Sequence, residues 1–228
     1  LGAWVRHLPS RLGLSTPMTC RCLTLISLRD TDLRMCEFAQ CNWRGADLTN
    51  ASLQMAYFGL ADLSLATLVG AKLFGSCFEH TQAIRASFSK TKLSCARFPQ
   101  ANLEGADFFA SAGSGVDFFQ ANCNGAKFLG ANLPEANFRG TNLTNADLRQ
   151  TGLQFADFDE AILTGADLRG ADLEGARITD EQLRSAKYQP ADADPDHEEL
   201  QGFISRSRSD ENWPFQLRSF LTPSPQRN

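Results

Sequence analysis

Apolar and polar residues alternate in this chain with a period of five. The stretch 131–150, ANLPEANFRGTNLTNADLRQ, divides into ANLPE, ANFRG, TNLTN and ADLRQ. If the central residue of each unit is placed at 28, 33 and onward to 178, there are 31 centres, of which 16 are Leu and 10 are Phe. Two residues before the centre, 20 of the 31 positions are Ala. A large and a small apolar residue therefore recur every five residues, and the frame never shifts.

A period of five fits neither an α-helix, with 3.6 residues per turn, nor a strand, whose side chains alternate every two residues. Self-similarity at a fixed short period is typical of a solenoid. A five-residue unit is too short to bury anything alone, so several units must form a coil and the coils must stack. We expect 26–178 to place the large and small apolar residues of each unit inward and the other three residues outward.

The phenylalanines predict how many units make one coil. All ten central Phe residues lie at positions that end in 8, and one column taken every twenty residues is almost entirely Phe. This column contains Phe38, Phe58, Phe78, Phe98, Phe118, Phe138 and Phe158, followed by Ile178. A period of twenty indicates four units per coil, with this Phe column as a core ladder. At a strand spacing of about 4.8 Å, 31 units at four per coil predict a rod about 37 Å long.

The units share the consensus sequence A(D/N)LxG. Examples are ADLTN at 46–50, ANLEG at 101–105, ADLRG at 166–170 and ADLEG at 171–175. This pattern resembles the pentapeptide-repeat family. The resemblance implies an all-β fold, a right-handed quadrilateral parallel β-helix, over residues 26–178. It implies no particular activity, because proteins of many roles share this fold.

The residue before each centre is often Asn or Asp, as at Asn102, Asp147 and Asp167. Such side chains bind nearby backbone groups at turns. We interpret these acids as structural elements of the coil rather than as catalytic carboxylates.

The C-terminal end of the repeats carries the pattern of a helix cap. Thr179 and Gln182 match a capping box, which predicts a short helix near 180–187 in a capping segment 179–188. Residues 189–228 begin with the acidic run PADADPDHEELQ and are expected to form a largely disordered tail. The alternative for its apolar piece, WPFQLRSFL, is docking to a partner or back onto the rod.

Residues 1–25 form a basic N-terminal arm or cap, with Arg6, Arg11 and Arg21 and no acid. This composition is typical of a transit peptide, which would direct the protein to an organelle. The alternatives are that the chain is a fragment or that its native start is Met18. Otherwise a cytoplasmic location is expected, and no run of about 18 apolar residues predicts a membrane span.

The segment 110–119, ASAGSGVDFF, departs from the repeat because Gly113 replaces a large apolar centre. A glycine-rich loop can bind phosphate, but no Lys-Ser or Lys-Thr pair and no helix follow. A local packing dent or bend is the favoured interpretation, with Phe108 and Phe118 filling the space.

No catalytic or metal-binding motif stands out. The chain lacks HExxH, G-x-S-x-G, a P-loop and paired CxxC motifs, so we expect no enzyme activity, no cofactor and no metal. The repeat frame places Cys36, Cys41 and Cys123 inward, and Cys77 and Cys95 outward as free surface thiols.

Function should therefore reside in the outward residues. An apolar group of Val69, Phe109 and Leu129 follows the centres on one face, where we expect exposure to solvent and a partner surface. Acids offer a second possible surface. They are Asp107 and Asp147 on that face, and Asp157, Asp159 and Glu160 on another.

These patterns favour a non-enzymatic, rigid scaffold that binds an unknown protein partner or a second copy of itself. The alternative is a mimic of DNA that modulates DNA gyrase, as the resemblance to quinolone-resistance members of the family implies. Residues 26–178 hold 17 acids and 13 bases, and Arg149, Arg169, Arg139 and Lys127 interrupt the acidic rows. This mixed charge weakens the mimic and also argues against direct binding of nucleic acid.

Overall fold

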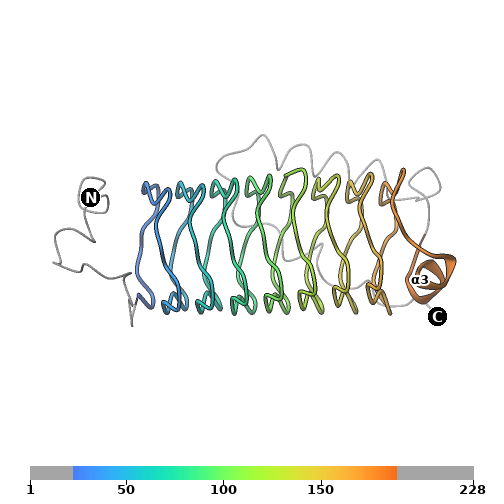
Figure 1. Cartoon of the computed structure of the whole chain (residues 1–228), viewed down its shortest axis with the longest axis horizontal. Helices are drawn as coiled ribbons and strands as arrows, with labels where there is room; N and C mark the ends of the chain where they lie inside the picture. Colours follow the sequence, from blue (N-terminus) through green and yellow to red (C-terminus); the bar gives the residue numbers. More distant parts are fainter. Residues whose placement is uncertain (1–22, 189–228) are drawn as a thin grey trace, which may run out of the picture.

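The computed structural model describes residues 23–188, which form a straight rod of stacked coils with one helix at its C-terminal end (Figure 1). That helix is α3 (Asp180–Ser185). The N-terminal arm up to residue 22 and the tail 189–228 lie outside the described residues.

Neighbouring coils are joined by parallel pairing between residues twenty apart. The residue before each centre makes the bridge, from Ser27 with Asp47 at one end to Asp167 with Lys187 at the other. Within this ladder the N–H of Asp47 donates to the carbonyl of Ile26 at 2.8 Å. The period of twenty and the four units per coil are therefore confirmed, and the fold is a four-sided parallel β-helix.

Each unit ends in a corner at its fifth residue. This residue has a positive φ in nearly every unit, whether it is Gly, as at Gly45 (66°), or another residue, as at Asn50 (57°). The next N–H then bonds back to the preceding centre, as Ala46 does to Trp43 at 2.9 Å. Because only Gly adopts this conformation without steric cost, a non-glycine corner residue carries backbone strain.

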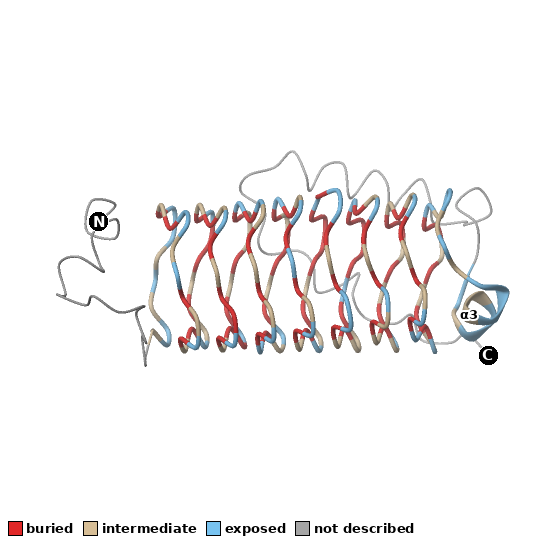
Figure 2. Ribbon diagram, in the orientation of Figure 1, coloured by how far each residue is buried: buried red, intermediate tan, exposed pale blue. Residues whose placement is uncertain are grey.

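The interior is filled by the centres and the small residues two positions before them (Figure 2). From Phe58 to Phe158 the rings of the predicted ladder stack with centroids 4.7 to 5.2 Å apart and planes within 10°. At the N-terminal end the ring of Phe38 is tilted by 35° against Phe58 and meets Trp43 edge-on.

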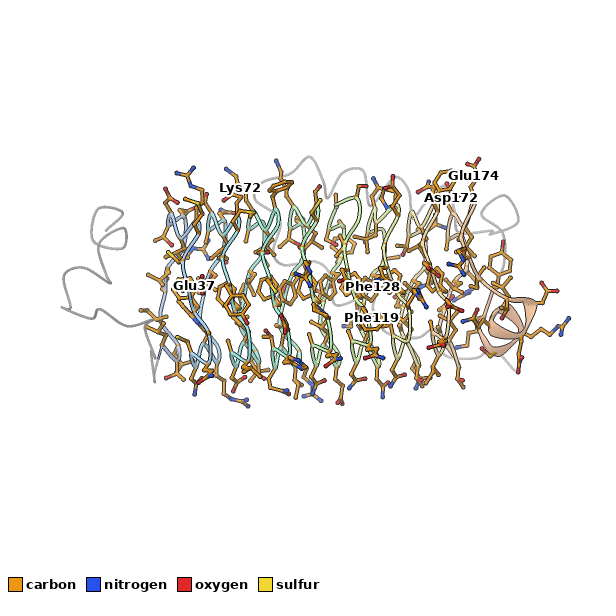
Figure 3. The ribbon with its side chains drawn as sticks, in the orientation of Figure 1. Glu37, Lys72, Phe119, Phe128, Asp172 and Glu174 are labelled. Carbon is orange, nitrogen blue, oxygen red and sulfur yellow. The ribbon has the colours of Figure 1, made fainter. Side chains whose placement is uncertain are left out.

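The structure also contains a second Phe column, which we had not separated from its Leu neighbours in the sequence. Phe88, Phe108 and Phe128 stack at 4.9 Å and face the first column edge-on, with centroids 5.5 to 5.9 Å apart. Figure 3 shows Phe128 in the row of rings along the rod.

This double column explains the irregular centres. The coil that contains Phe108 and Phe118 carries Gly113 and Cys123 at its two other centres, so two small residues compensate for two large ones. Such compensation keeps the core volume nearly constant. Gly113 also permits a close approach, since a Cβ there would lie 2.4 Å from the nitrogen of Ser94 and 2.5 Å from the carbonyl carbon of Leu93.

α3 closes the C-terminal end as the sequence indicated. The Thr179 hydroxyl accepts from the N–H of Gln182, and the Gln182 side chain accepts from the N–H of Thr179, which completes the capping box. The helix ends at Ser185, two residues earlier than expected, because Ala186 is already extended and Lys187 pairs with Asp167 again.

Candidate interaction surfaces

The acids that precede the centres are bound to the backbone of their own units. Asp107 accepts a hydrogen bond from the N–H of Phe109 at 2.9 Å. Asp147 accepts one from Arg149 at 3.2 Å, and Asp157 accepts one from Asp159 at 3.0 Å. The structural role expected for these carboxylates is confirmed.

Arginines neutralise much of the acidic rows. The Arg149 guanidinium donates to both carboxylate oxygens of Asp147 at 2.9 and 2.8 Å, and Arg169 does the same to Asp167 at 2.9 and 2.7 Å. On another face Arg177 pairs with Asp157 at 3.0 Å and Arg139 with Asp159 at 3.1 Å. The face therefore alternates in charge, instead of presenting the evenly spaced negative charges of a DNA backbone.

The arginines also affect the titration of the carboxylates. Burial alone would raise the pKa of Asp167, but hydrogen bonds from the side chain and backbone of Arg169, and the nearby charges of Arg169 and Arg149, lower it overall. At the opposite end, the pKa of Asp47 is raised by burial but lowered more by Thr49 and Arg29. Both side chains are thus held as anions inside the rows.

The expected exposure of Phe109 and Leu129 was wrong. Their exposed fractions are 4% and 3%, and together with Ala110 they form a small apolar cluster outside the main core. Val69, two coils nearer the N-terminus than Phe109, is half-buried and does not join the cluster. Phe119, which the frame also places outward, is exposed as expected.

The burial extends along one corner of the rod. We call the corner strip the six buried outward residues Phe109, Ala110, Leu129, Gly130, Gln150 and Gly170. The same corner is exposed near the N-terminus, at Asp30 and Asn50. A second corner of the strip's own coils is exposed at Gly115, Glu135 and Phe155.

The opposite situation occurs at the N-terminal end. We call the N-terminal apolar corner Met35, Met55 and Phe74, which are 76%, 57% and 52% exposed. The two methionines occupy the same corner on adjacent coils, and the N–H of Met55 donates to the carbonyl of Phe74 at 2.9 Å. The repeat frame places Phe74 outward, whereas Met35 and Met55, at the fifth position of their units, were not predicted as a surface. Large apolar residues at that position, where Gly or Asn suits the backbone better, were the available signal.

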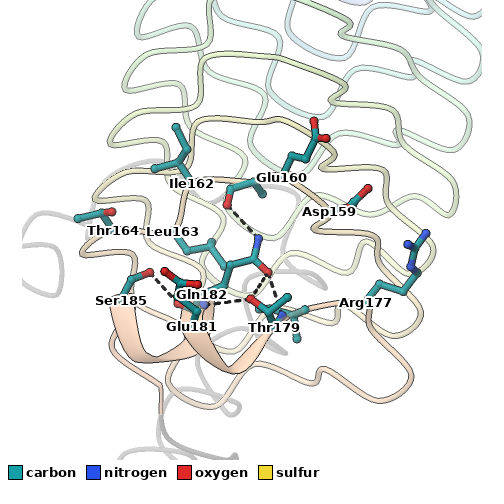
Figure 4. Close-up of a pocket in the computed structure, with 12 residues that line it drawn as sticks. Asp159, Glu160, Ile162, Leu163, Thr164, Arg177, Thr179, Glu181, Gln182 and Ser185 are labelled. Atoms are coloured by element: carbon teal, nitrogen blue, oxygen red, sulfur yellow. Dashed lines mark hydrogen bonds between the residues drawn. The ribbon is translucent and has the colours of Figure 1, made fainter.

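A pocket lies between the last coil and α3 (Figure 4). Asp159, Glu160 and Ile162 line one side, and Thr179, Gln182 and Ser185 line the other. The side-chain amide of Gln182 bridges the two sides, donating to the carbonyls of Phe158 at 2.7 Å and Ala161 at 2.9 Å. The pocket thus contains Asp159 and Glu160 of the predicted acidic surface. The Gln182 amide, however, joins the capping helix to the last coil.

The titratable and metal-ligating side chains of residues 23–188 are dispersed along the rod. No three His, Cys, Asp or Glu side chains of this segment are placed to share a metal ion. Cys41 and Cys123 are buried, and burial raises the pKa of the Cys123 thiol. Cys77 and Cys95 are accessible free thiols, as expected. None of the helices in 23–188 is long and apolar enough to cross a membrane.

The repeats match the family model described as pentapeptide repeats, in eight copies. The matched residues are 26–64, 44–79, 71–108, 114–150 and 142–180, more than half of the chain. The chain belongs to the pentapeptide-repeat family. The gap between 108 and 114 contains Gly113, the centre that departs most from the repeat.

Solved structures of other pentapeptide-repeat proteins share the fold, a right-handed quadrilateral β-helix. A trypsin-treated form of QnrB1, a plasmid-mediated fluoroquinolone resistance protein, has a TM-score of 0.55 at 13% identity, covering 70% of this chain and 92% of its own. HetL, involved in heterocyst differentiation regulation in the cyanobacterium Nostoc, has a TM-score of 0.33 at 22% identity, covering 85% and 98%. No curated protein matches the sequence.

Proposed function

We propose that this protein is a non-enzymatic scaffold that presents the N-terminal apolar corner to another protein. The observation that carries this proposal is the placement of large apolar side chains at exposed corners. Among the nine corners from 25 to 65, five hold Leu or Met, namely Leu25, Met35, Met55, Leu60 and Leu65. Among the later corners up to Gly175, the exposed large apolar residue is Phe155.

These corner residues are unfavourable for the free protein in two ways. Each non-glycine side chain at positive φ costs about 1 kcal/mol of strain. Each also leaves apolar surface in water, at about 25 cal/mol per Å². A partner that covers Met35, Met55 and Phe74 would recover the second cost, because contiguous exposed apolar surface is the usual mark of a protein-binding site.

The test compares two full-length variants of equal polarity change. One is Met35→Gln/Met55→Gln/Phe74→Gln, and its matched control is Phe119→Gln/Phe155→Gln/Ile162→Gln, which alters exposed apolar residues elsewhere. Immobilised wild-type protein and both variants are compared for bound proteins and for self-association by sedimentation. We expect an interaction that the first variant loses and the control keeps. Equal binding by all three proteins would contradict the proposal.

The competing hypothesis, modulation of DNA gyrase, is supported by the fold shared with QnrB1 alone. The arginine pairs of Asp147 and Asp167 oppose it, since they break the acidic row. A supercoiling assay with purified gyrase, with and without a quinolone, separates the two. Inhibition or drug protection at low micromolar protein would favour the DNA mimic, and no effect at tens of micromolar would leave the scaffold.

A further inference from the structure

One side of the rod carries bases toward its N-terminal end and acids toward its C-terminal end. We call the graded face the six segments that stack on this side: GAKLFG at 70–75, KTKLSC at 90–95, ASAGSG at 110–115, GANLPE at 130–135, QTGLQF at 150–155 and GADLEG at 170–175. Among these segments, bases occur in the first two and acids in the last three. Figure 3 shows Lys72 and, farther along the same edge of the rod, Asp172 and Glu174.

The charges of the graded face are not neutralised within the chain. The exposed side chains are Lys72, Lys92, Glu135, Asp172 and Glu174. None of these five forms an ion pair with a described residue. The hydrogen-bond donors to Asp172 are uncharged. The graded face therefore differs from the other acidic rows, whose carboxylates are paired with arginines of the same chain.

The middle of the graded face is free of long side chains. Ala112, Ser114 and Gly115 are exposed, and Gly113 replaces a large apolar centre between them. Because these residues have small side chains or none, another flat surface can approach the backbone closely at this point. The face is thus flat in the middle and oppositely charged on its two sides.

We propose that the graded face binds the graded face of a second copy of this chain in antiparallel orientation. A parallel arrangement would place lysines against lysines and acids against acids, which opposes association. Reversal of one rod instead places Lys72 opposite Asp172 of the second copy, with Lys92 and Glu174 close to this pair. A two-fold axis forms each of these contacts twice. The charge distribution therefore selects both the partner and the orientation.

The same register brings the small residues together. Leu73 and Leu173 are equally distant from a point between Gly113 and Leu133, so the two-fold axis passes through that point. Segment 110–115 of one copy then faces segment 130–135 of the other. The coils that contain Met35 and Met55 extend beyond the overlap, so both methionines stay accessible at opposite ends of the dimer. The dimer thus goes beyond the scaffold proposal and does not require its partner.

Sedimentation of the full-length protein tests the dimer. We expect a dimer at about 100 µM protein that weakens about tenfold when the salt rises from about 50 to 500 mM, because salt screens exposed charges. Lys72→Glu/Lys92→Glu should weaken it at least about tenfold, and so should Asp172→Lys/Glu174→Lys. The variant that combines all four reversals should restore it. The matched control is Arg85→Glu/Lys127→Glu, which reverses two exposed bases outside the graded face and should keep wild-type association.

Zero-length coupling of lysines to carboxylates by a carbodiimide, followed by mass spectrometry, tests the register. Five coil steps separate Lys72 from Asp172, about 24 Å at the usual strand spacing. A link between Lys72 and Asp172 or Glu174 therefore cannot form within one rod. We expect this link in the dimer of the wild-type protein and its absence in the Lys72→Glu/Lys92→Glu variant.

Three results would overturn the proposal. A protein that is monomeric at about 100 µM in low salt has no such interface. A dimer that survives both pairs of charge reversals, or that the combined variant does not restore, associates through another surface. A dimer without the link from Lys72 to Asp172 or Glu174 has another register. All of these variants keep Met35, Met55 and Phe74, so failure of the dimer is distinguishable from failure of the scaffold proposal.

Discussion

Outward apolar residues differ between the N-terminal end of the rod and its central coils. At the N-terminal end Met35 and Met55 occupy strained corners and are exposed. In the central coils the outward residues Phe109 and Leu129 are buried. The repeat builds the same interior in both regions, so the difference lies in the outward residues. The repeat therefore specifies the rod, and departures from it distinguish one region of the surface from another.

The largest effect should come from the interior, where the middle of the rod differs from its ends. Phe98 is fully buried and its ring contacts those of Phe78, Phe88, Phe108 and Phe118. Phe98→Ala should lower the free energy of unfolding by about 3–5 kcal/mol, because the packed neighbours cannot collapse into the cavity. Chemical denaturation measures this loss. A loss below about 1 kcal/mol would contradict the ring ladder.

Phe38→Ala is the matched variant at the N-terminal end. Phe38 contacts rings on one side of its column, and its own exposed fraction is 6%. The loss of stability should be clearly smaller than that of Phe98→Ala, since the terminal coil at this end can relax into the space. Equal losses of stability in the two variants would show that the N-terminal end packs as rigidly as the middle of the rod.

The next effect concerns the compensating glycine in the double-Phe coil. Gly113→Ala should cost about 3 kcal/mol, since its Cβ would overlap the backbone of Leu93 and Ser94 and the coils must separate. Gly125→Ala places a Cβ in open space at a φ of 63° and should cost only about 1 kcal/mol of backbone strain. Thermal unfolding of both variants checks the order of the two losses. A larger loss for Gly125→Ala would show that backbone strain at Gly125 costs more than the atomic overlap at Gly113.

The features that could be predicted from the sequence are those that the repeat itself specifies. The coil period, the Phe ladder and the capping box could be predicted, because each is a fixed spacing with one physical solution. The second Phe column was equally visible every twenty residues, at Phe88, Phe108 and Phe128, and was missed only because the column begins and ends with Leu.

The surface could not be predicted to the same extent. The frame places Phe109, Leu129 and Phe119 outward with equal certainty, yet the first two are buried and the third is exposed. The difference depends on contacts made beyond the unit itself, and a local period carries no information about them. Charge pairing was partly visible, because Arg149 and Arg169 follow Asp147 and Asp167 by two residues.

An intermediate effect is expected at the C-terminal cap, which the N-terminal end lacks among the described residues. Gln182→Ala removes the donor to the carbonyls of Phe158 and Ala161 and half of the capping box. It should cost about 1–2 kcal/mol. Hydrogen exchange should show the loss in 158–165 and leave the N-terminal coils unchanged. Uniform faster exchange along the rod would mean that the cap and the repeats unfold as one unit.

A small effect of opposite sign is expected at the N-terminal corner. Met55→Asn should raise the free energy of unfolding by about 0.5 kcal/mol, because Asn tolerates the left-handed conformation better than Met does. The same variant should weaken the partner interaction. Phe155→Asn, with an equal change of conformation at the other end, should stabilise similarly and leave binding intact. If Met55→Asn instead lowers the free energy of unfolding, the Met55 side chain contributes to the stability of the fold.

The smallest effect separates the two ends by pH. The folded-state pKa of Asp167 is lowered, so its stabilising contribution is complete above its ordinary value of about 3.9 and disappears as the pH falls through the folded-state value. Asp167→Asn should therefore cost less than about 1 kcal/mol at neutral pH, and the difference from wild type should vanish in acid. The same change at Asp47, whose side chain is 33% exposed against 16% for Asp167, should show a smaller difference, because water screens it more. Denaturation of both variants at pH values from about 2 to 7 gives the comparison, with Glu104→Gln as the exposed control. A larger effect at Asp47 would mean that water screens its carboxylate less in solution than its exposed fraction indicates.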